Sequence, residues 1–238
     1  MIQARSRLHH WYAENKRDLP WRSEPSPYHI WLSEIILQQT RVAQGMDYYL
    51  RFVDAFPTVF DLANAEEDSI LKLWQGLGYY NRARNLHAAA KQVVTEHSGS
   101  FPDDYDGLLS LKGVGPYTAA AIASIAYHLP HAVVDGNVIR VLARVHGIEA
   151  PVDQGSTLKE IQNLANAFLS RAHPGDHNQA VMELGALVCT PRTPNCVACP
   201  LRAECKAHKL DLIDSIPIKS KKIKRRSRFF HYIIATEA

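Results

Sequence analysis

The sequence lacks a long hydrophobic run. No stretch of 18 consecutive apolar residues occurs, which excludes a transmembrane helix of ordinary length. The first seven residues lead into a polar segment rather than into the apolar core of a signal peptide. With 46% hydrophobic and 21% charged residues, the 238-residue chain has the composition of a globular protein with a substantial core. We therefore expect a soluble, cytoplasmic protein with no membrane partner.

The chain also lacks an excess of positive charge over most of its length. Its formal net charge is +3, but residues 219–228 hold seven of the 27 basic residues. The other 20 basic residues face 24 acidic ones, a net charge of −4. Overall charge therefore does not indicate a nucleic-acid binder, and any DNA contact must use local surfaces and backbone amides. The basic run itself is typical of a solvated linker.

Cysteine is scarce and confined to one place. The four cysteines lie within 17 residues, with the spacing Cys-x6-Cys-x2-Cys-x5-Cys: Cys189, Cys196, Cys199 and Cys205. Because nothing suggests secretion, we do not expect disulfides. Four thiolates can hold zinc or a [4Fe–4S] cluster. The spacing favours a bound metal over free thiols, but it leaves both kinds of metal open.

Apolar residues recur at helical spacing along most of the chain, which predicts an all-α fold. A β-strand is expected only near the end, at residues 229–235. The predicted helices cover residues 5–17, 27–44, 45–55, 59–63, 66–74, 80–97, 103–110, 116–128, 156–171 and 176–187, with a further helix starting at Asp135.

Two glycines mark a tight turn between two of these helices. Gly113 and Gly115 can adopt positive φ, and Pro116 suits the first turn of the helix that follows. Such a turn leaves backbone N–H groups pointing outward at a helix N-terminus, which is a ready anion site. Asp135 is a favoured N-cap, and the dipole of its helix orients the carboxylate and keeps it ionised. An anion site followed by a placed aspartate suggests chemistry on a nucleic acid.

Glu34 lies beside the buried face of a predicted helix. Its neighbours three and four positions away are Ile30, Trp31, Leu37 and Gln38, of which three are apolar. A carboxyl group there is partly desolvated, which raises its pKa and suits a general acid. The alternative is a solvated glutamate at the edge of an amphipathic helix.

A second glycine-rich stretch, residues 76–80, combines two glycines and two tyrosines at the start of a helix. Arg82 and Arg84 follow in its first turns, where the helix dipole disfavours cations unless an anion binds. Two interpretations remain open. The stretch is either a loop that approaches a flat or anionic ligand, or an ordinary packed turn.

Four stretches resemble one family of DNA repair enzymes, in the same order. LKGVGPYTAAAIASIAY (residues 111–127) resembles the helix-hairpin-helix of the DNA glycosylases that include endonuclease III. VVDGNVIRVLAR (residues 133–144) resembles the Gly/Pro-Asp loop of that superfamily, and the four cysteines resemble its iron–sulfur loop. Within the superfamily, WLSEIILQQT (residues 31–40) and Tyr117 are similar to the adenine DNA glycosylase, or MutY, family. The resemblance covers about residues 11–205.

This resemblance implies a two-lobed helix-hairpin-helix glycosylase fold. A six-helix barrel domain would cover residues 23–132, and residues 1–22 and 133–215 would form the iron–sulfur domain. Residues 216–238 would be a basic linker and the start of a Nudix-like domain that this sequence lacks. The four cysteines would hold a [4Fe–4S] cluster.

The resemblance also implies a function in base excision repair, close to the chromosome. The chain would act as a monomer on double-stranded DNA and hydrolyse the N-glycosidic bond of adenine mispaired with 8-oxoguanine or guanine. Two carboxylates at a glycosidic bond, one acid and one anion, are the usual arrangement for this chemistry.

Site residues follow from the matching motif positions. Glu34 would protonate the adenine, and Asp135 would stabilise the cationic sugar, helped by Asn137 and Tyr117. The residues expected to bind the flipped adenine are Trp21, Arg22, Leu37 and Gln179. Those expected at the DNA duplex are Gln39, Thr40, Tyr79, Gly113 and Gly115, the two glycines holding a phosphate.

Tyr117 stands where endonuclease III-type enzymes carry a lysine whose amine attacks the sugar. A phenol cannot form that Schiff base, so the resemblance implies a monofunctional glycosylase. Three alternatives remain: an endonuclease III-like glycosylase of other specificity, a non-catalytic DNA-binding module, and a zinc-stabilised helical interaction protein.

Overall fold

The structure, a computed structural model, describes residues 2–23, 25–220, 229 and 232. This part of the chain contains helices and loops but no β-strand, so the all-α prediction is confirmed. The helices are α1 (Ile2–Asn15), α2 (Pro20–Ser23), α3 (Pro27–Leu37), α4 (Val42–Ala55), α5 (Val59–Asn64), α6 (Glu67–Trp74), α7 (Asn81–His97), α8 (Tyr105–Ser110), α9 (Pro116–Ala126), α10 (Gly136–His146), α11 (Gly155–Phe168), α12 (Pro174–Leu187), the 3-10 helix η1 (Arg202–Glu204) and α13 (Lys206–Lys209).

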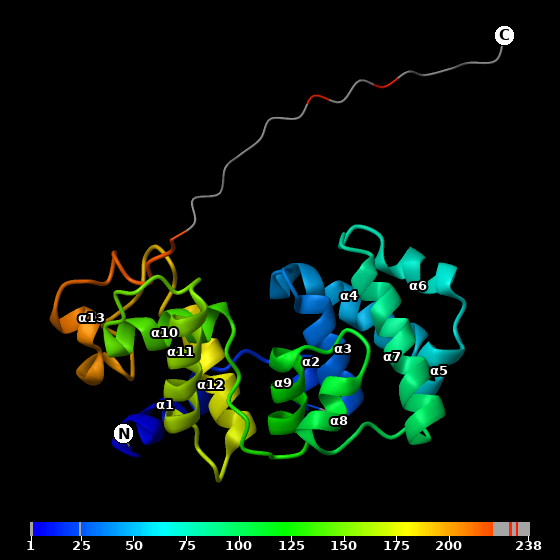
Figure 1. The fold of residues 1–238 in the computed structure, drawn as a ribbon, viewed down its shortest axis with the longest axis horizontal. Helices are drawn as coiled ribbons and strands as arrows, with labels where there is room; N and C mark the ends of the chain where they lie inside the picture. The colour runs from blue at the N-terminus through cyan, green and yellow to red at the C-terminus, as the bar shows by residue number, and fades with distance from the viewer. Residues whose placement is uncertain (1, 24, 221–228, 230–231, 233–238) are drawn as a thin grey trace.

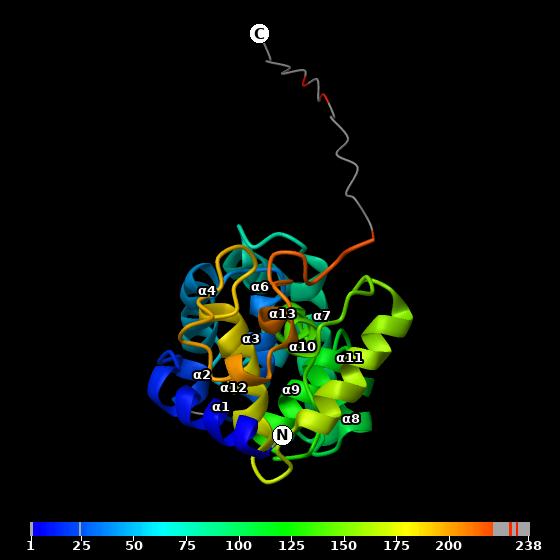
Figure 2. The same cartoon turned by 90° about the vertical axis from the view of Figure 1, so that its left-hand side faces the viewer.

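The helices form two lobes, each with its own hydrophobic core (Figure 1). The first core lies among α2 to α9 and contains the fully buried side chains of Trp31 and Trp74. The second core combines α1 with α10 to α13, so the N-terminal helix packs beside segments from the far end of the chain. Figure 2 views this second lobe from its outer side. Leu19 and Trp21 belong to the first core, although they lie close to α1 in the sequence.

Helix α12 joins the two lobes by packing against both α9 and α10. Two glycines allow this close approach. A Cβ atom on Gly175 would lie 2.7 Å from the carbonyl oxygen of Ser124, and one on Gly185 would lie 2.6 Å from the Cβ of Asn137. The buried Asn178, between them on α12, donates a 2.8 Å hydrogen bond to the hydroxyl of Ser124. The lobes therefore meet along a tightly packed seam.

The helix predicted over residues 27–44 is wrong, because α3 ends at Leu37 and α4 begins only at Val42. Gln39, in the turn between them, has a left-handed backbone with a φ of 59°. The guanidinium group of Arg82, from α7, donates hydrogen bonds to carbonyl oxygens at the end of α3. A distant side chain thus binds carbonyl groups that a continuing helix would have used.

Two further predictions concern the chain ends and the membrane. The basic run at residues 219–228 and the strand expected at 229–235 lie largely outside the described residues. Across residues 2–23 and 25–220, no helix is both long and apolar enough to cross a membrane.

Candidate active site

A cavity of about 530 Å³ lies at the seam between the two lobes. Nine of the predicted site residues line it: Trp21, Arg22, Glu34, Leu37, Thr40, Tyr117, Asp135, Asn137 and Gln179. A smaller hollow adjoins it and shares Glu34, Tyr117 and Asp135 with the larger cavity, while Gln39 lines this hollow as well. The structure therefore brings together residues that are up to 158 positions apart in the chain, from Trp21 to Gln179.

Glu34 lies in the last turn of α3. Ser26 caps the start of this helix by accepting a hydrogen bond from the N–H of His29, and Pro27 occupies its first position. Most of the helix is buried in the first core, and the half-buried Glu34 faces the cavity together with Ile30, Ser33 and Leu37. Burial raises the pKa of Glu34 to about 7, while a hydrogen bond from the Tyr117 hydroxyl opposes the shift and nearby Asp135 adds to it. The raised pKa that the sequence predicts is confirmed.

Asp135 faces Glu34 across the cavity as the N-cap of α10. Its carboxylate accepts hydrogen bonds of 2.7 Å each, from the N–H of Val138 and from the side-chain amide of Asn137. Burial raises the pKa of Asp135 above its ordinary value, although these hydrogen bonds and the cation of Arg140 oppose the shift. The carboxylate is therefore held in a fixed orientation by groups that favour its charged form.

Asp135 belongs to a hydrogen-bond network that extends away from the cavity through Asn137 and Arg140. Arg140 donates to the side-chain oxygen of Asn137 at 2.8 Å and to the carbonyl oxygen of Cys189 at 2.6 Å. A continuous chain of hydrogen bonds therefore joins the candidate catalytic carboxylate to the backbone of the first cysteine.

Tyr117 reaches the same cavity from the first turn of α9. Burial and the neighbouring carboxyl groups of Glu34 and Asp135 raise the pKa of Tyr117 well above its ordinary value. The phenol therefore remains neutral, and its hydroxyl lies within hydrogen-bonding reach of the Glu34 carboxyl group and of the sulfur of Met182, the latter at 3.8 Å.

One charged cluster in the cavity wall was not predicted from the sequence. The carboxylate of Glu183 is only 1% exposed and accepts hydrogen bonds of 2.7 Å from Arg17 and 2.9 Å from Arg22. Burial would raise the pKa of Glu183, but hydrogen bonds from the two arginines lower it to about 2. Arg22 also donates to the side-chain oxygen of Gln179 at 3.1 Å, which fixes the orientation of that amide.

A weak sequence signal for this cluster existed. Gln179 and Glu183 are one helical turn apart on α12, so their side chains share a face. The partners Arg17 and Arg22 are more than 150 positions away, and no local pattern could have identified them.

The glycine turn adopts only part of the predicted geometry. Gly113 has a positive φ of 75°, as expected, and a Cβ atom there would lie 2.7 Å from the Cβ of Asn85. Gly115 instead has an extended backbone with a φ of −96°, so the positive φ considered for it is wrong. It is the N-cap of α9 without a side-chain cap, and nothing lies within 4 Å of the position of its missing Cβ. An anion can therefore approach this helix end closely.

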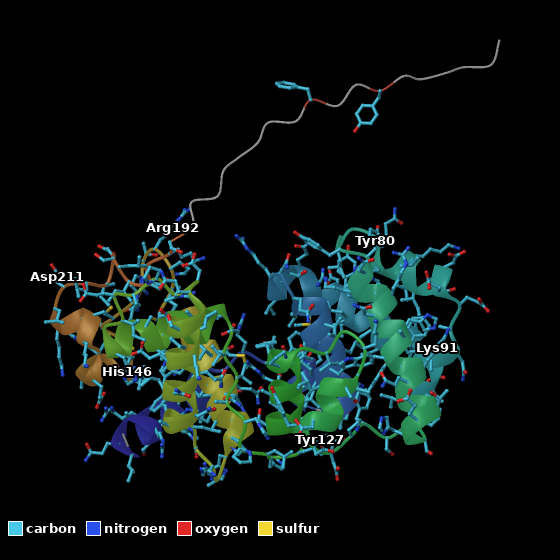
Figure 3. The ribbon with its side chains drawn as sticks, in the orientation of Figure 1. Tyr80, Lys91, Tyr127, His146, Arg192 and Asp211 are labelled. Carbon is cyan, nitrogen blue, oxygen red and sulfur yellow. The ribbon has the colours of Figure 1, made fainter. Side chains whose placement is uncertain are left out.

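Arg82 and Arg84 do not require a bound anion. The terminal nitrogens of Arg82 donate to backbone carbonyl oxygens, and Arg84 forms an ion pair of 3.2 Å with Glu67. Tyr79, in the preceding turn, is 68% exposed and lies outside both cavities. In the view of Figure 3, its neighbour Tyr80 and Arg192 of the cysteine loop lie on the same upper edge of the two lobes.

The four cysteines line one small cavity in the second lobe, and none of them forms a disulfide. Arg144 donates to the sulfur of Cys189 at 3.4 Å. Burial, reinforced by the neighbouring cysteines, raises the pKa of Cys199 to about 11 against a hydrogen bond from the Leu201 backbone. A bound metal would compensate the negative charge that burial disfavours at the Cys199 sulfur. The donor set therefore fits a group that binds four thiolates.

In the part of the chain that the structure describes, no three Cys, His, Asp or Glu side chains are grouped to hold one metal ion.

Comparisons with known proteins agree with this geometry. Residues 32–171 match the HhH-GPD superfamily base excision DNA repair protein family. The chain is 48% identical over 215 residues to the adenine DNA glycosylase of Mus musculus, covering 86% of this chain and 41% of that protein. It is 36% identical over 211 residues to the adenine DNA glycosylase of Buchnera aphidicola, covering 88% and 60%. The chain thus spans about two fifths of the mouse relative's length.

Solved structures show the same fold. A thermostable thymine-DNA glycosylase superposes with a TM-score of 0.79 at 28% identity, covering 87% of this chain and 95% of that one. A non-covalent endonuclease III–DNA complex superposes with a TM-score of 0.72 at 22% identity, covering 89% and 97%. The predicted two-lobed helix-hairpin-helix glycosylase fold is confirmed.

The buried carboxyl group of Glu34 predicts a pH-dependent effect of the substitution Glu34→Gln on stability. The folded pKa of about 7 lies above the ordinary 4.5, so folding binds the proton more tightly. The contribution of this bound proton to the stability of the fold is fully present below the unfolded pKa, and it is lost as the pH rises through the folded pKa. An amide has no charge to desolvate. As the pH rises from about 4.5 to about 8, the free energy of unfolding of Glu34→Gln should therefore increase by about 1–3 kcal/mol relative to that of the parent chain.

Denaturant unfolding at both pH values measures this difference. The exposed Glu66, substituted as Glu66→Gln, is the matched control and should change little with pH. Parallel pH curves for Glu34→Gln and the parent chain would show that the Glu34 carboxyl is not desolvated.

Proposed function

Because the chain belongs to the helix-hairpin-helix superfamily of base excision DNA repair proteins, we propose that it is an adenine-specific DNA N-glycosylase. Its substrate is adenine opposite 8-oxoguanine or guanine in double-stranded DNA, and it is a monofunctional hydrolase that acts as a monomer. The observation that carries this proposal is the Glu34 carboxyl group, with its pKa of about 7, in the same cavity as Asp135. The adenine DNA glycosylase relatives support the choice of base.

The two carboxyl groups have different tasks. Adenine leaves readily only after a ring nitrogen has been protonated, and Glu34 holds a transferable proton near neutral pH. Asp135 accepts hydrogen bonds that favour its anion, and it stabilises the cationic sugar as the glycosidic bond breaks. Different environments thus make one carboxyl group an acid and the other an anion. Water then completes the hydrolysis.

The target adenine reaches the cavity by rotating out of the duplex. Trp21 and Leu37 offer apolar walls, and the amide of Gln179 offers a donor and an acceptor to the adenine edge. The hydrogen bond from Arg22 to Gln179 sets the direction of that amide. Since Arg22 is itself bound by the buried Glu183, the recognising group is held in place before the base arrives.

The duplex is held outside the cavity by two kinds of contact. The backbone amides at Gly113 and Gly115 bind a phosphate at the uncapped start of α9. Gln39 and Tyr79, with Thr40 beside them, occupy the space that the adenine leaves. The exposure of Tyr79 and the position of Gln39 at the smaller hollow support these roles.

The residues that would hold a [4Fe–4S] cluster are Cys189, Cys196, Cys199 and Cys205. When bound, such a group supplies a rigid link that fixes the cysteine loop. Arg140 joins the backbone of that loop to Asn137, so the order of the loop supports the position of Asp135. We propose domain limits of 23–132 against 1–22 and 133–215, with the cavity at their boundary; the packing of Leu19 and Trp21 in the first core moves the first limit towards the N-terminus.

Single-turnover release of adenine tests the proposed function. The parent chain should release adenine from duplexes that carry it opposite 8-oxoguanine or guanine. Glu34→Gln removes the acid and should slow release by about a hundredfold or more, while duplex binding is retained. Glu66→Gln should behave as the parent. Duplex binding without adenine release by the parent would point to a binding module instead.

Tyr117→Lys tests the monofunctional assignment. A lysine at this position places an amine next to Glu34 and Asp135, where it can form a Schiff base with the sugar. Borohydride should trap this variant on DNA, and strand cleavage should accompany base release. Tyr80→Lys, at the surface, should not be trapped. Strong trapping of the parent chain would contradict the assignment.

A further inference from the structure

We propose that Arg82 is a positioning residue that holds two DNA-facing turns in one arrangement. The first turn, residues 38–40, carries Gln39, and the second, residues 77–79, carries Tyr79. Arg82 fixes the two turns relative to each other, so that both side chains enter the duplex together. This inference rests on the proposed function for the role of the two turns, whereas the contacts of Arg82 are independent of it.

Arg82 binds the first turn through backbone carbonyl groups. One terminal nitrogen, Nη1, donates to the carbonyl oxygens of Ile35 at 3.0 Å, Ile36 at 3.3 Å and Gln38 at 2.6 Å. The last carbonyl groups of a helix lack partners within it, and a cation there complements the helix dipole. Arg82 therefore ends α3 and determines where the chain turns towards Gln39.

The same guanidinium group binds the second turn. Its other terminal nitrogen, Nη2, donates to the carbonyl oxygen of Leu77 at 3.4 Å. The group lies 5.1 Å from the ring centre of the buried Trp74 and 5.8 Å from that of Tyr79. Trp74 donates from its indole nitrogen to the carbonyl oxygen of Gly78 at 2.9 Å. Both turns are thus attached to one side chain and to the core beneath it.

The two turns need such support. Gln39 and Tyr79 have left-handed backbones, with φ values of 59° and 47°, which residues with a Cβ adopt at a cost in free energy. Tyr79 is 68% exposed, so core packing of its own ring does not fix its position. The backbone contacts made by Arg82 fix the two turns that carry these strained residues relative to each other.

The geometry requires an arginine. The two terminal nitrogens of the planar Arg82 guanidinium group bind four carbonyl oxygens from two segments. A lysine ammonium group has donors at one point only and cannot span both segments. Arg84 lies two positions further along the same helix. It is exposed and paired with Glu67, so it offers a control.

The test compares Arg82→Met and Arg82→Lys with Arg84→Met in the full chain. Hydrogen exchange in the free protein should become faster at residues 38–40 and 77–79 in both Arg82 variants, and nowhere else. Single-turnover adenine release is then measured on two duplexes. One has adenine opposite guanine, and the other has adenine opposite an abasic site, where no pairing resists extrusion.

Arg82→Met should slow release from the adenine–guanine duplex by about tenfold or more, because misplaced turns no longer stabilise the opened duplex. Release opposite the abasic site should stay within about twofold of the parent. Arg84→Met should match the parent in both assays. A residue with a purely structural role would not produce this difference between substrates.

Unchanged exchange at the two turns, or equal slowing on both duplexes, would overturn the proposal. If Arg82→Met does not fold, Arg82→Lys, which keeps the charge, is judged by the same criteria. If the parent chain releases no adenine, the proposed function fails. The exchange measurement then still decides whether Arg82 holds the two turns together.

Discussion

Burial of the Glu34 carboxyl group at the seam between the lobes is the constraint on which the candidate site depends. The first lobe supplies Glu34 at the end of α3 and Tyr117 at the start of α9, and the second supplies Asp135 at the start of α10. Asp135 could not act with the other two unless the lobes met closely. Helix α12 makes this possible, since Gly175 and Gly185 let it approach α9 and α10 without side chains between them.

The cavity holds glutamates in two opposite electrostatic states. Glu183 is almost completely buried, yet two arginines lower its pKa to about 2 and keep it ionised. Burial raises the pKa of Glu34 to about 7, although a hydrogen bond with Tyr117 opposes the shift. A buried carboxylate is stable only when it is paired. The permanent charge of Glu183 therefore holds Arg17 and Arg22 in place, while Glu34 retains the proton that the proposed chemistry requires.

The sequence predicted what depends on local pattern. Helical periodicity located most of the helices, and the apolar neighbours of Glu34 predicted its raised pKa. Prediction from the sequence failed where a residue far away in the chain determines the local structure. Arg82 ends α3 from more than 40 positions away, and Arg17 binds Glu183 across 166 positions. The sequence also could not tell which of the two glycines uses a positive φ, because a glycine permits such a φ without requiring one.

The protonation of Glu34 is the central claim, and nuclear magnetic resonance can measure it directly. Glutamate labelled with ¹³C at the side-chain carboxyl carbon is incorporated, and the Glu34 signal is assigned by its absence from Glu34→Gln. The account predicts that this signal titrates with a midpoint near the pKa of about 7. A midpoint near the ordinary value of 4.5 would show an ionised carboxylate at neutral pH and would contradict its role as the acid.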